Sequence, residues 1–179
     1  VLPHDHGIFI VHGPDILYLE DTDNDGKADK RTKLLSGLGI QDTHTSSHHL
    51  TRTPGGWITF SQGCNSFGDV TDAKGKKTPF HRALIGRFKP SGTHLEVIGA
   101  GMNNIWAWAE DRLGRVFIHE ANDFGFGLVP FERDSSYPSF ISSKIHPDAP
   151  MHPQTAEGLG LGGTGFSGIA ICDDRSGSF

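Results

Sequence analysis

The hydrophobic residues of this chain alternate with polar ones in short runs, and each run is set off by a glycine-containing turn. Counting from the glycines at 7, 56 and 114, apolar residues stand two and four positions later, at Phe9, Val11, Ile58, Phe60, Val116 and Ile118. A period of two puts these side chains on one face of a β-strand. We therefore predict an all-β protein made of short strands, and no long stretch shows the period of a helix.

The turn glycines themselves recur, at positions 7, 56, 114 and 177, with spacings of 49, 58 and 63 residues. A unit of roughly 40 to 50 residues that is lengthened by insertions is typical of the four-stranded blades of a β-propeller. About three such blades are too few to close a ring and remove its sheet edges, so we expect a segment of a larger propeller domain. The alternative is a chance recurrence of a short hairpin motif.

This repeat divides the chain into units and strands. The units are a partial blade over 1–36, a blade over 37–99, a blade with a long proline-rich insertion over 100–164, and the start of another blade over 165–179. We expect strands at 7–13, 16–20, 31–35, 49–53, 57–61, 81–88, 94–98, 107–110, 115–119 and 168–173. In such a blade, the loop after the fourth strand and the loop between the second and third strands share one end.

An acidic loop follows the strand at 16–20. Asp21, Asp23 and Asp25 stand at alternate positions, Gly26 permits a sharp turn, and Asp29 occupies the ninth position. Carboxylate oxygens in this DxDxDG arrangement are typical calcium ligands, whereas an acidic turn without a metal is the alternative. The twelfth position lacks the glutamate of an EF-hand, and strands flank the loop. We predict a structural calcium site at the end of the blade remote from the active site.

Polar residues gather in the loops that are predicted to share the opposite end. We expect loop 37–47 to bring Asp42 and His44 there, with His48 close by, and segment 62–68 to arrive beside it. The loops that follow add further amide and carboxyl groups, at Gln62, Asn103, Asn104, Glu120, Asn122 and Asp123.

Composition excludes several classes of partner and cofactor. The formal charge is −5, and no Lys/Arg patch exists beyond residues 74–77, which argues against nucleic acid. No apolar run approaches the ~18 residues of a membrane span. Cys64 and Cys172 form neither a CxxC nor a CxxCH motif, so no haem is predicted in this segment.

Three stretches together resemble a known group of proteins: PDILYLEDTDNDGKADKRTKLLSG at 14–37, GLGIQDTHTSSHHL at 37–50 and GMNNIWAWAEDRLGRVFIHEANDFG at 101–125. They are similar to the propeller proteins called membrane-bound dehydrogenases in planctomycete-type bacteria, relatives of the soluble sugar and sorbosone dehydrogenases that depend on pyrroloquinoline quinone (PQQ). The similarity covers nearly the whole chain, and stretches 21–29 and 41–44 are its most specific parts.

The resemblance implies a six-bladed β-propeller that is exported to the periplasm or the cell exterior. It also implies a PQQ-type quinone cofactor, a sugar-like substrate and a c-type cytochrome domain or protein as electron acceptor. In the related enzymes a histidine ahead of a first strand abstracts the substrate proton, and His44 stands closest to that position, with His48 as its rival. Asn103 and Asn104 match an asparagine-bearing loop, but Met102 stands where those enzymes carry an arginine.

The sequence therefore leads to three hypotheses about function. In an oxidoreductase, His44 is the general base, Asp42 orients its ring, and cofactor or substrate is held by Gln62, Asn103, Asn104, Glu120 and Asn122. In a calcium-dependent lactonase-like hydrolase, Asn104, Glu120, Asn122 and Asp123 bind a catalytic ion. A non-catalytic propeller that presents this end to a protein or glycan is the third, in which His44 is an ordinary loop histidine.

Overall fold

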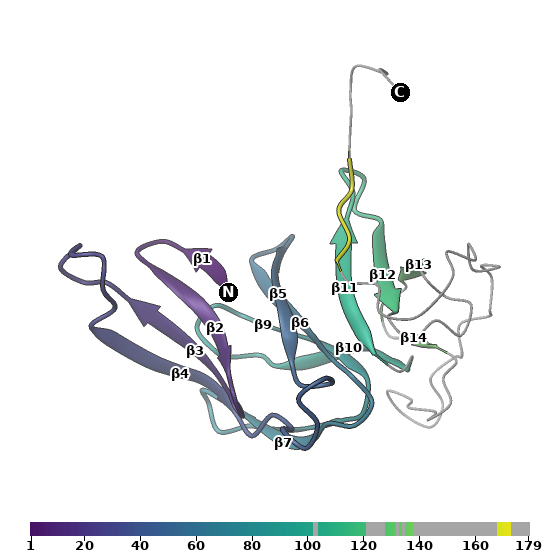
Figure 1. The fold of residues 1–179 in the computed structure, drawn as a ribbon, viewed down its shortest axis with the longest axis horizontal. Coiled ribbons are helices and arrows are strands. Elements are labelled where there is room, and N and C mark those ends of the chain that lie inside the picture. The colour runs from purple at the N-terminus through teal and green to yellow at the C-terminus, as the bar shows by residue number, and fades with distance from the viewer. Residues whose placement is uncertain (102–103, 121–127, 132, 134, 138–167, 173–179) are drawn as a thin grey trace.

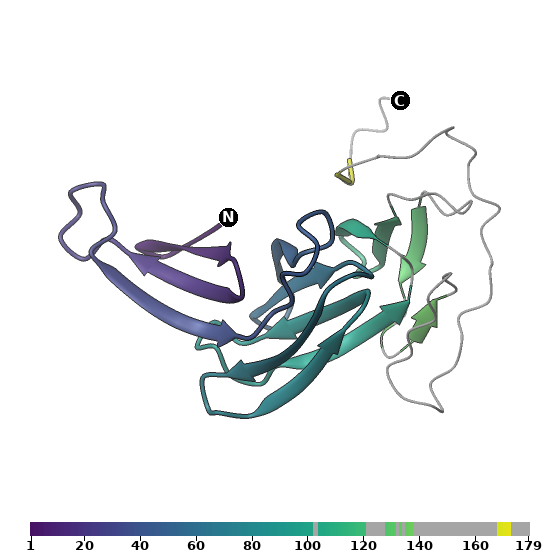
Figure 2. The same cartoon turned by 60° about the horizontal axis from the view of Figure 1, so that its bottom comes forward.

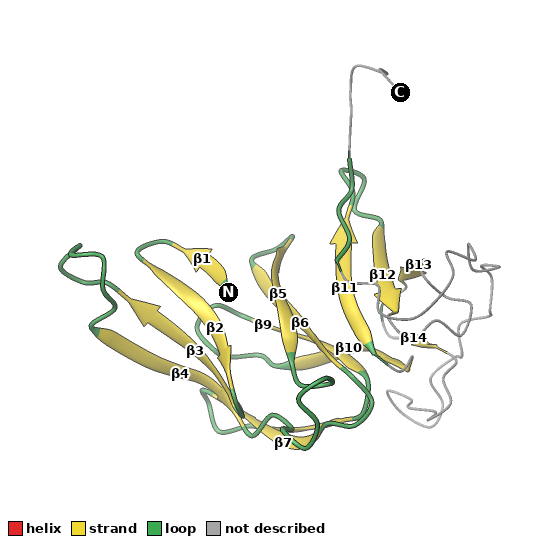
Figure 3. Ribbon diagram, viewed as in Figure 1, coloured by secondary structure: helices red, strands yellow, loops and turns green. Residues whose placement is uncertain are grey.

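The computed structural model of the protein describes residues 1–101, 104–120, 128–131, 133, 135–137 and 168–172. In this part every regular element is a β-strand, and turns and loops join the strands (Figure 3). The predicted all-β class is therefore confirmed. Over the same residues there is no helix long and apolar enough to cross a membrane.

The first sheet is built mainly from the N-terminal strands. Its order is β1 (Leu2–His4), β2 (Gly7–His12), β3 (Asp15–Glu20), β4 (Lys30–Ser36), β7 (Phe67–Asp72) and β8 (Lys77–His81). Neighbours from β1 to β4 are antiparallel and consecutive in sequence. The strands predicted at 7–13, 16–20 and 31–35 are confirmed as β2, β3 and β4. No bound of these three strands differs from the prediction by more than one residue.

The second sheet is a meander with one added strand. Its order is β5 (His48–Thr53), β6 (Trp57–Gln62), β9 (Leu84–Phe88), β10 (Glu96–Gly101) and β14 (Ser135–Tyr137). The first four strands pair antiparallel, whereas β14 lies parallel to β10. The third sheet contains β11 (Ile105–Glu110), β12 (Val116–Glu120) and β13 (Leu128–Phe131), again antiparallel.

The three sheets lie one after another, each packed on the next (Figures 1 and 2). Phe9 and Leu35 of the first sheet share one core with Phe60 and Phe88 of the second, and each of these four side chains is at most 1% exposed. A second core joins the second sheet to the third through Ile85, Ile98, Ile105, Trp108 and Ile118. Burying each large apolar side chain contributes about 1.5–3 kcal/mol, so the faces predicted from the period of two hold the sheets together.

Two sequence expectations were wrong. Residues 67–81 form the β7–β8 hairpin, which leaves the second sheet and pairs with β4 through Leu35↔Asp72 and Ser36↔Thr71. The third strand of that sheet therefore begins at Leu84, later than the predicted 81. At the chain's end, residues 168–172 belong to no strand.

Candidate active site

Loop 37–47, between β4 and β5, starts from a firmly held backbone. The N–H groups of Gly37 and Leu38 both donate to the Pro14 carbonyl at 2.9 Å, in the turn between β2 and β3. Gly37 has φ of 94°, and a side chain there would lie 2.5 Å from the Asp69 carbonyl oxygen, so glycine is required. Leu38 is buried, which fixes the direction in which the loop leaves the sheet.

Asp42 and His44 contact one another within this loop, as predicted. One Asp42 carboxylate oxygen accepts from the His44 backbone N–H at 2.9 Å and lies 3.3 Å from His44 Nδ1. Because a carboxylate only accepts, this contact places the proton on Nδ1 and leaves Nε2 as the basic atom. The His44 side chain is 88% exposed, so Nε2 is accessible to a substrate.

A third residue, which the sequence reasoning did not select, holds the carboxylate. Asn65 Nδ2 donates to the second Asp42 oxygen at 3.0 Å. This hydrogen bond first, and then the one from the His44 backbone, lower the pKa of Asp42, so the group stays ionised near neutral pH. The sequence indicated only that segment 62–68 lies beside this loop.

Gln62 shapes that neighbouring segment from within the core. It is fully buried, and its Nε2 lies within 3.1 Å of the carbonyl oxygens of Ser66, Phe80 and Arg82. Its Oε1 accepts from Ser47 Oγ at 3.3 Å. These contacts occupy the amide, so Gln62 positions the loops and does not face a ligand, contrary to its expected cofactor-binding role.

Three segments meet at Gly63, directly after β6: Gly63 itself, loop 37–47 and the residue before β11. Its N–H donates to the Thr45 carbonyl at 2.9 Å, and a Cβ built on Gly63 would lie 2.7 Å from both Thr45 Cβ and Asn104 Oδ1. The residue next to His44 therefore lies close to Asn104, at the start of the third sheet. Asn104 itself is only 6% exposed, which makes it a support of this junction.

The remaining predicted residues are placed only in part. Glu120 is the last residue of β12, and its backbone pairs with Ile105 beside Asn104. Asn103, Asn122 and Asp123 lie outside the described residues. The calcium-lactonase ligand set therefore stays a prediction.

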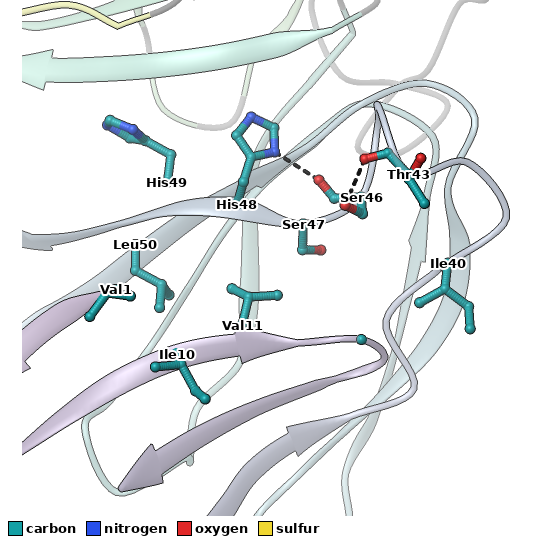
Figure 4. A pocket seen from close by; sticks show the side chains of 11 residues that line it. Val1, Ile10, Val11, Ile40, Thr43, Ser46, Ser47, His48, His49 and Leu50 are labelled. Atoms are coloured by element: carbon teal, nitrogen blue, oxygen red, sulfur yellow. Dashed lines mark hydrogen bonds between the residues drawn. The ribbon is translucent and has the colours of Figure 1, made fainter.

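His48 and His49 border a pocket of about 620 Å³ between β2 and β5. Figure 4 shows Val11 and Leu50 between the two strands, with both histidine rings on the side of β5 away from β2. His48 Nδ1 donates to the Ser46 carbonyl at 2.7 Å. The His48 ring packs on the Trp106 ring, and the two ring centres are 5.1 Å apart. His48 is therefore half-buried between strands, whereas His44 faces solvent.

The acidic loop lies at the other end of β4. Asp21, Asp23 and Asp29 each offer a carboxylate oxygen, and these oxygens lie within 4.8 Å of one another. Asp25 does not join them: its Oδ1 accepts from the Lys27 N–H at 2.8 Å. Three of the four predicted ligands therefore converge.

Backbone hydrogen bonds favour the ionised form of Asp21 in this loop. Desolvation disfavours ionisation of Asp21, but backbone N–H groups of Gly26, Asn24 and Asp25 outweigh it and lower the pKa of Asp21. Gly26 has φ of 86°, as the sharp turn required. Carboxylate oxygens that already converge are the ligands that a hard divalent cation such as calcium prefers.

The profile of the family described as Domain of unknown function (DUF7133) matches residues 1–156. The chain belongs to this family. Comparisons with curated proteins and with solved structures gave no significant match.

Proposed function

We propose that the chain is part of a β-propeller that oxidises a hydroxyl or aldehyde group of a sugar-like substrate with a PQQ-type quinone. The electrons would pass to a c-type cytochrome, and the protein would work in the periplasm or outside the cell. The observation that carries this proposal is the Asp42–His44 pair, in a loop whose Thr45 lies close to Gly63, after β6, and to Asn104, before β11. The resemblance of stretches 14–37, 37–50 and 101–125 to quinone-dependent propellers supports it.

The protein's own residues supply the proton chemistry. His44 Nε2 accepts the proton of the substrate hydroxyl, and histidine is the side chain that most often acts as a general base. Asp42 holds Nδ1 and stabilises the imidazolium that forms, and Asn65 holds Asp42. Gln62 holds the neighbouring loops through its hydrogen bonds with Ser47, Ser66 and Arg82, and Asn104 is buried beside Gly63.

A quinone, when bound, supplies the two-electron acceptor that no side chain provides. The described residues offer two features that fit a planar, carboxylated ring system. Phe67 is 40% exposed, and the Arg82 guanidinium lies 5.3 Å from the centre of its ring. Gln41 fixes Phe67 to the His44 loop through hydrogen bonds of 2.9 and 3.0 Å to its backbone. Arg82 thus supplies a cation at this end of the sheets, although Met102 replaces the expected arginine.

The test is dye-linked oxidation of a panel of aldoses and alcohols, measured with and without added PQQ. We expect activity only with PQQ, and His44→Asn lowers kcat by about 10²-fold or more, as loss of a general base does. His48→Asn is the matched control, because it replaces a neighbouring histidine whose ring lies against Trp106.

Two results would reject this assignment. The first is that the wild-type protein shows no PQQ-dependent oxidation of any compound in the panel. The second is that His48→Asn abolishes activity while His44→Asn keeps it. The second result would move the base from His44 to His48.

A second candidate is a propeller that binds a protein or glycan without catalysis. Ile40 is 57% exposed and lies next to Gln41, which is bonded to the partly exposed Phe67. Exposed apolar side chains at one end are typical of binding surfaces. This candidate gains support if PQQ has no effect and Ile40→Asp abolishes capture of a partner.

The acidic loop is proposed as a calcium site with a structural role. Asp21, Asp23 and Asp29 would hold the ion between β3 and β4. Because this loop precedes β4 and the His44 loop follows it, bound calcium would stabilise the sheet and take no part in catalysis.

A further inference from the structure

The pocket of about 620 Å³ between β2 and β5 opens beside the turn that carries His44. The Thr45 N–H donates to the Asp42 carbonyl at 3.1 Å, so Thr43 and His44 are the two central residues of a tight turn. Thr43 lines the pocket, and so does Ser46, whose Oγ donates to the Thr43 carbonyl at 3.2 Å. Because consecutive Cα atoms are about 3.8 Å apart, the backbone of His44 lies at the edge of the pocket.

The walls of this pocket are apolar and partly open to water. Val11 of β2 and Leu50 of β5 lie in the space between the two strands (Figure 4). Val11 is only partly buried, and Ile40, which comes before the turn, is 57% exposed. Covering such side chains is favourable because it removes apolar surface from water. The walls therefore favour an apolar ligand group.

One polar side chain of the lining is free to bind a ligand. No Asp, Glu, Lys or Arg is among the described residues that line the pocket. Ser46 and Ser47 donate their hydroxyls to other protein groups, and the rings of His48 and His49 lie on the far side of β5 (Figure 4). Thr43 is exposed, and its hydroxyl makes no hydrogen bond within the part of the chain that the structure describes. The ligand is therefore expected to be neutral, with its polar end at Thr43.

We propose that this pocket holds an apolar group of the substrate, while the reacting hydroxyl or aldehyde lies at His44. The assignment rests on the proposed function, and it narrows the substrate to a neutral sugar-like compound that carries an alkyl chain or an aromatic ring. The Thr43 hydroxyl binds the polar head, and Val11 and Leu50 contact the apolar group. The volume of about 620 Å³ falls within the range of about 300–1,000 Å³ for small-molecule pockets, whose walls are mainly apolar with few polar groups.

The experiment is a calorimetric titration with methyl, butyl and hexyl β-D-glucoside in the absence of quinone. We expect affinity to rise with chain length, by up to about fourfold for each added CH₂ that becomes buried. Val11→Thr keeps the β-branched shape but puts a hydroxyl on the apolar wall, so hexyl glucoside should bind about fivefold more weakly, with little change for methyl glucoside. Thr43→Ala removes the hydroxyl that binds the head, and should weaken all three glucosides by the same factor of about fivefold.

Val116→Thr is the matched control, because it makes the same change at a partly buried valine in β12 of the third sheet. It should leave the affinity for every glucoside unchanged. If Val11→Thr fails to fold, Thr43→Ala at the exposed turn still gives a test. Equal affinity for methyl and hexyl glucoside, an unchanged dependence on chain length in Val11→Thr, or unchanged affinities in Thr43→Ala would overturn the proposal.

The oxidation assay separates this proposal from the proposed function. With PQQ present, kcat/KM should be higher for hexyl than for methyl glucoside, and Val11→Thr should reduce that ratio. Chain-length-dependent binding without any PQQ-dependent oxidation would reject the proposed function and the substrate role of the bound glucoside, but would keep the apolar site. Oxidation at the same kcat/KM for both glucosides would overturn the pocket assignment alone.

Discussion

At the scale of single residues, histidines play two different parts. His44 is exposed and paired with a carboxylate, whereas His49 is half-buried and His119 is buried. His49 has φ of 56° at a break in the β5–β6 register, and its Nε2 donates to the Trp108 carbonyl of β11 at 3.0 Å. It thus joins the second sheet to the third. The sequence shows only a histidine pair at this point.

The buried histidines predict loss of stability in acid. Desolvation lowers the pKa of His49 and of His119, so the unfolded chain binds protons that the folded chain excludes. The free energy of unfolding therefore falls as pH drops below the ordinary histidine pKa of ~6.5. Urea denaturation at several pH values between neutral pH and about pH 5 measures this pH dependence of the free energy of unfolding.

His49→Asn is the matched variant, because asparagine also adopts positive φ and does not titrate. It should be less stable at neutral pH and show a shallower pH dependence. An unchanged slope would show that His49 does not carry the effect.

Asp42 gives a second prediction at this scale. Asp42→Asn removes the charge that holds His44 Nδ1, so the oxidation rate should fall by about tenfold or more while substrate KM changes little. Asp69→Asn is the control, because an Asp69 carboxylate oxygen lies 3.3 Å from His81 Nε2 in another exposed Asp–His pair with the same separation. Equal loss in both variants would contradict the special role of Asp42.

At the scale of elements, the alternation of polar and apolar residues predicted most strands. Phe9, Ile58, Phe60 and Ile118 are all buried, as the period of two required. The β7–β8 hairpin was missed because its partner is β4, and pairing with the edge of another sheet leaves no local trace. Gln62 was misread for a similar reason: its polarity suggested a ligand, but two of its three backbone acceptors, Phe80 and Arg82, are distant in sequence.

The β3–β4 loop predicts stabilisation by calcium. Calcium at 100 times its Kd should raise the free energy of unfolding by about 2.7 kcal/mol, because it binds only the folded loop. Thermal unfolding with CaCl₂, with MgCl₂ and with chelator measures it. Asp21→Asn and Asp23→Asn should remove most of the effect, whereas Asp5→Asn, at the nearby β1–β2 turn, should keep it. The same calcium response in all variants would contradict the site.

Gly63 tests the junction of the loops. Gly63→Ala places a methyl group 2.7 Å from Thr45 Cβ and Asn104 Oδ1, and overpacking of this kind costs about 1–3 kcal/mol. Gly13→Asn is the control, because Gly13 has φ of 61° and no neighbour within 4 Å. Chemical denaturation should show a large loss for the first and little for the second. Equal stability of Gly63→Ala and wild type would mean that the three segments do not meet there.

At the scale of the whole molecule, consecutive sheets share cores and place their loops at two ends. Loops 37–47 and 62–68 meet Asn104 at one end, and the acidic loop lies at the other. The propeller proposal rests on this placement of the loops. The alternation of polar and apolar residues does not encode a cofactor or a substrate, so their proposal rests on the site and on the resemblance of the three sequence stretches.

The most direct measurement is absorption spectroscopy of the protein titrated with PQQ and then mixed with an oxidisable aldose. A saturable spectral change is expected on quinone addition to both wild type and His44→Asn. The aldose should then reduce the quinone in a single turnover only with wild type. No spectral change on mixing, or equal reduction with His44→Asn, would contradict the account.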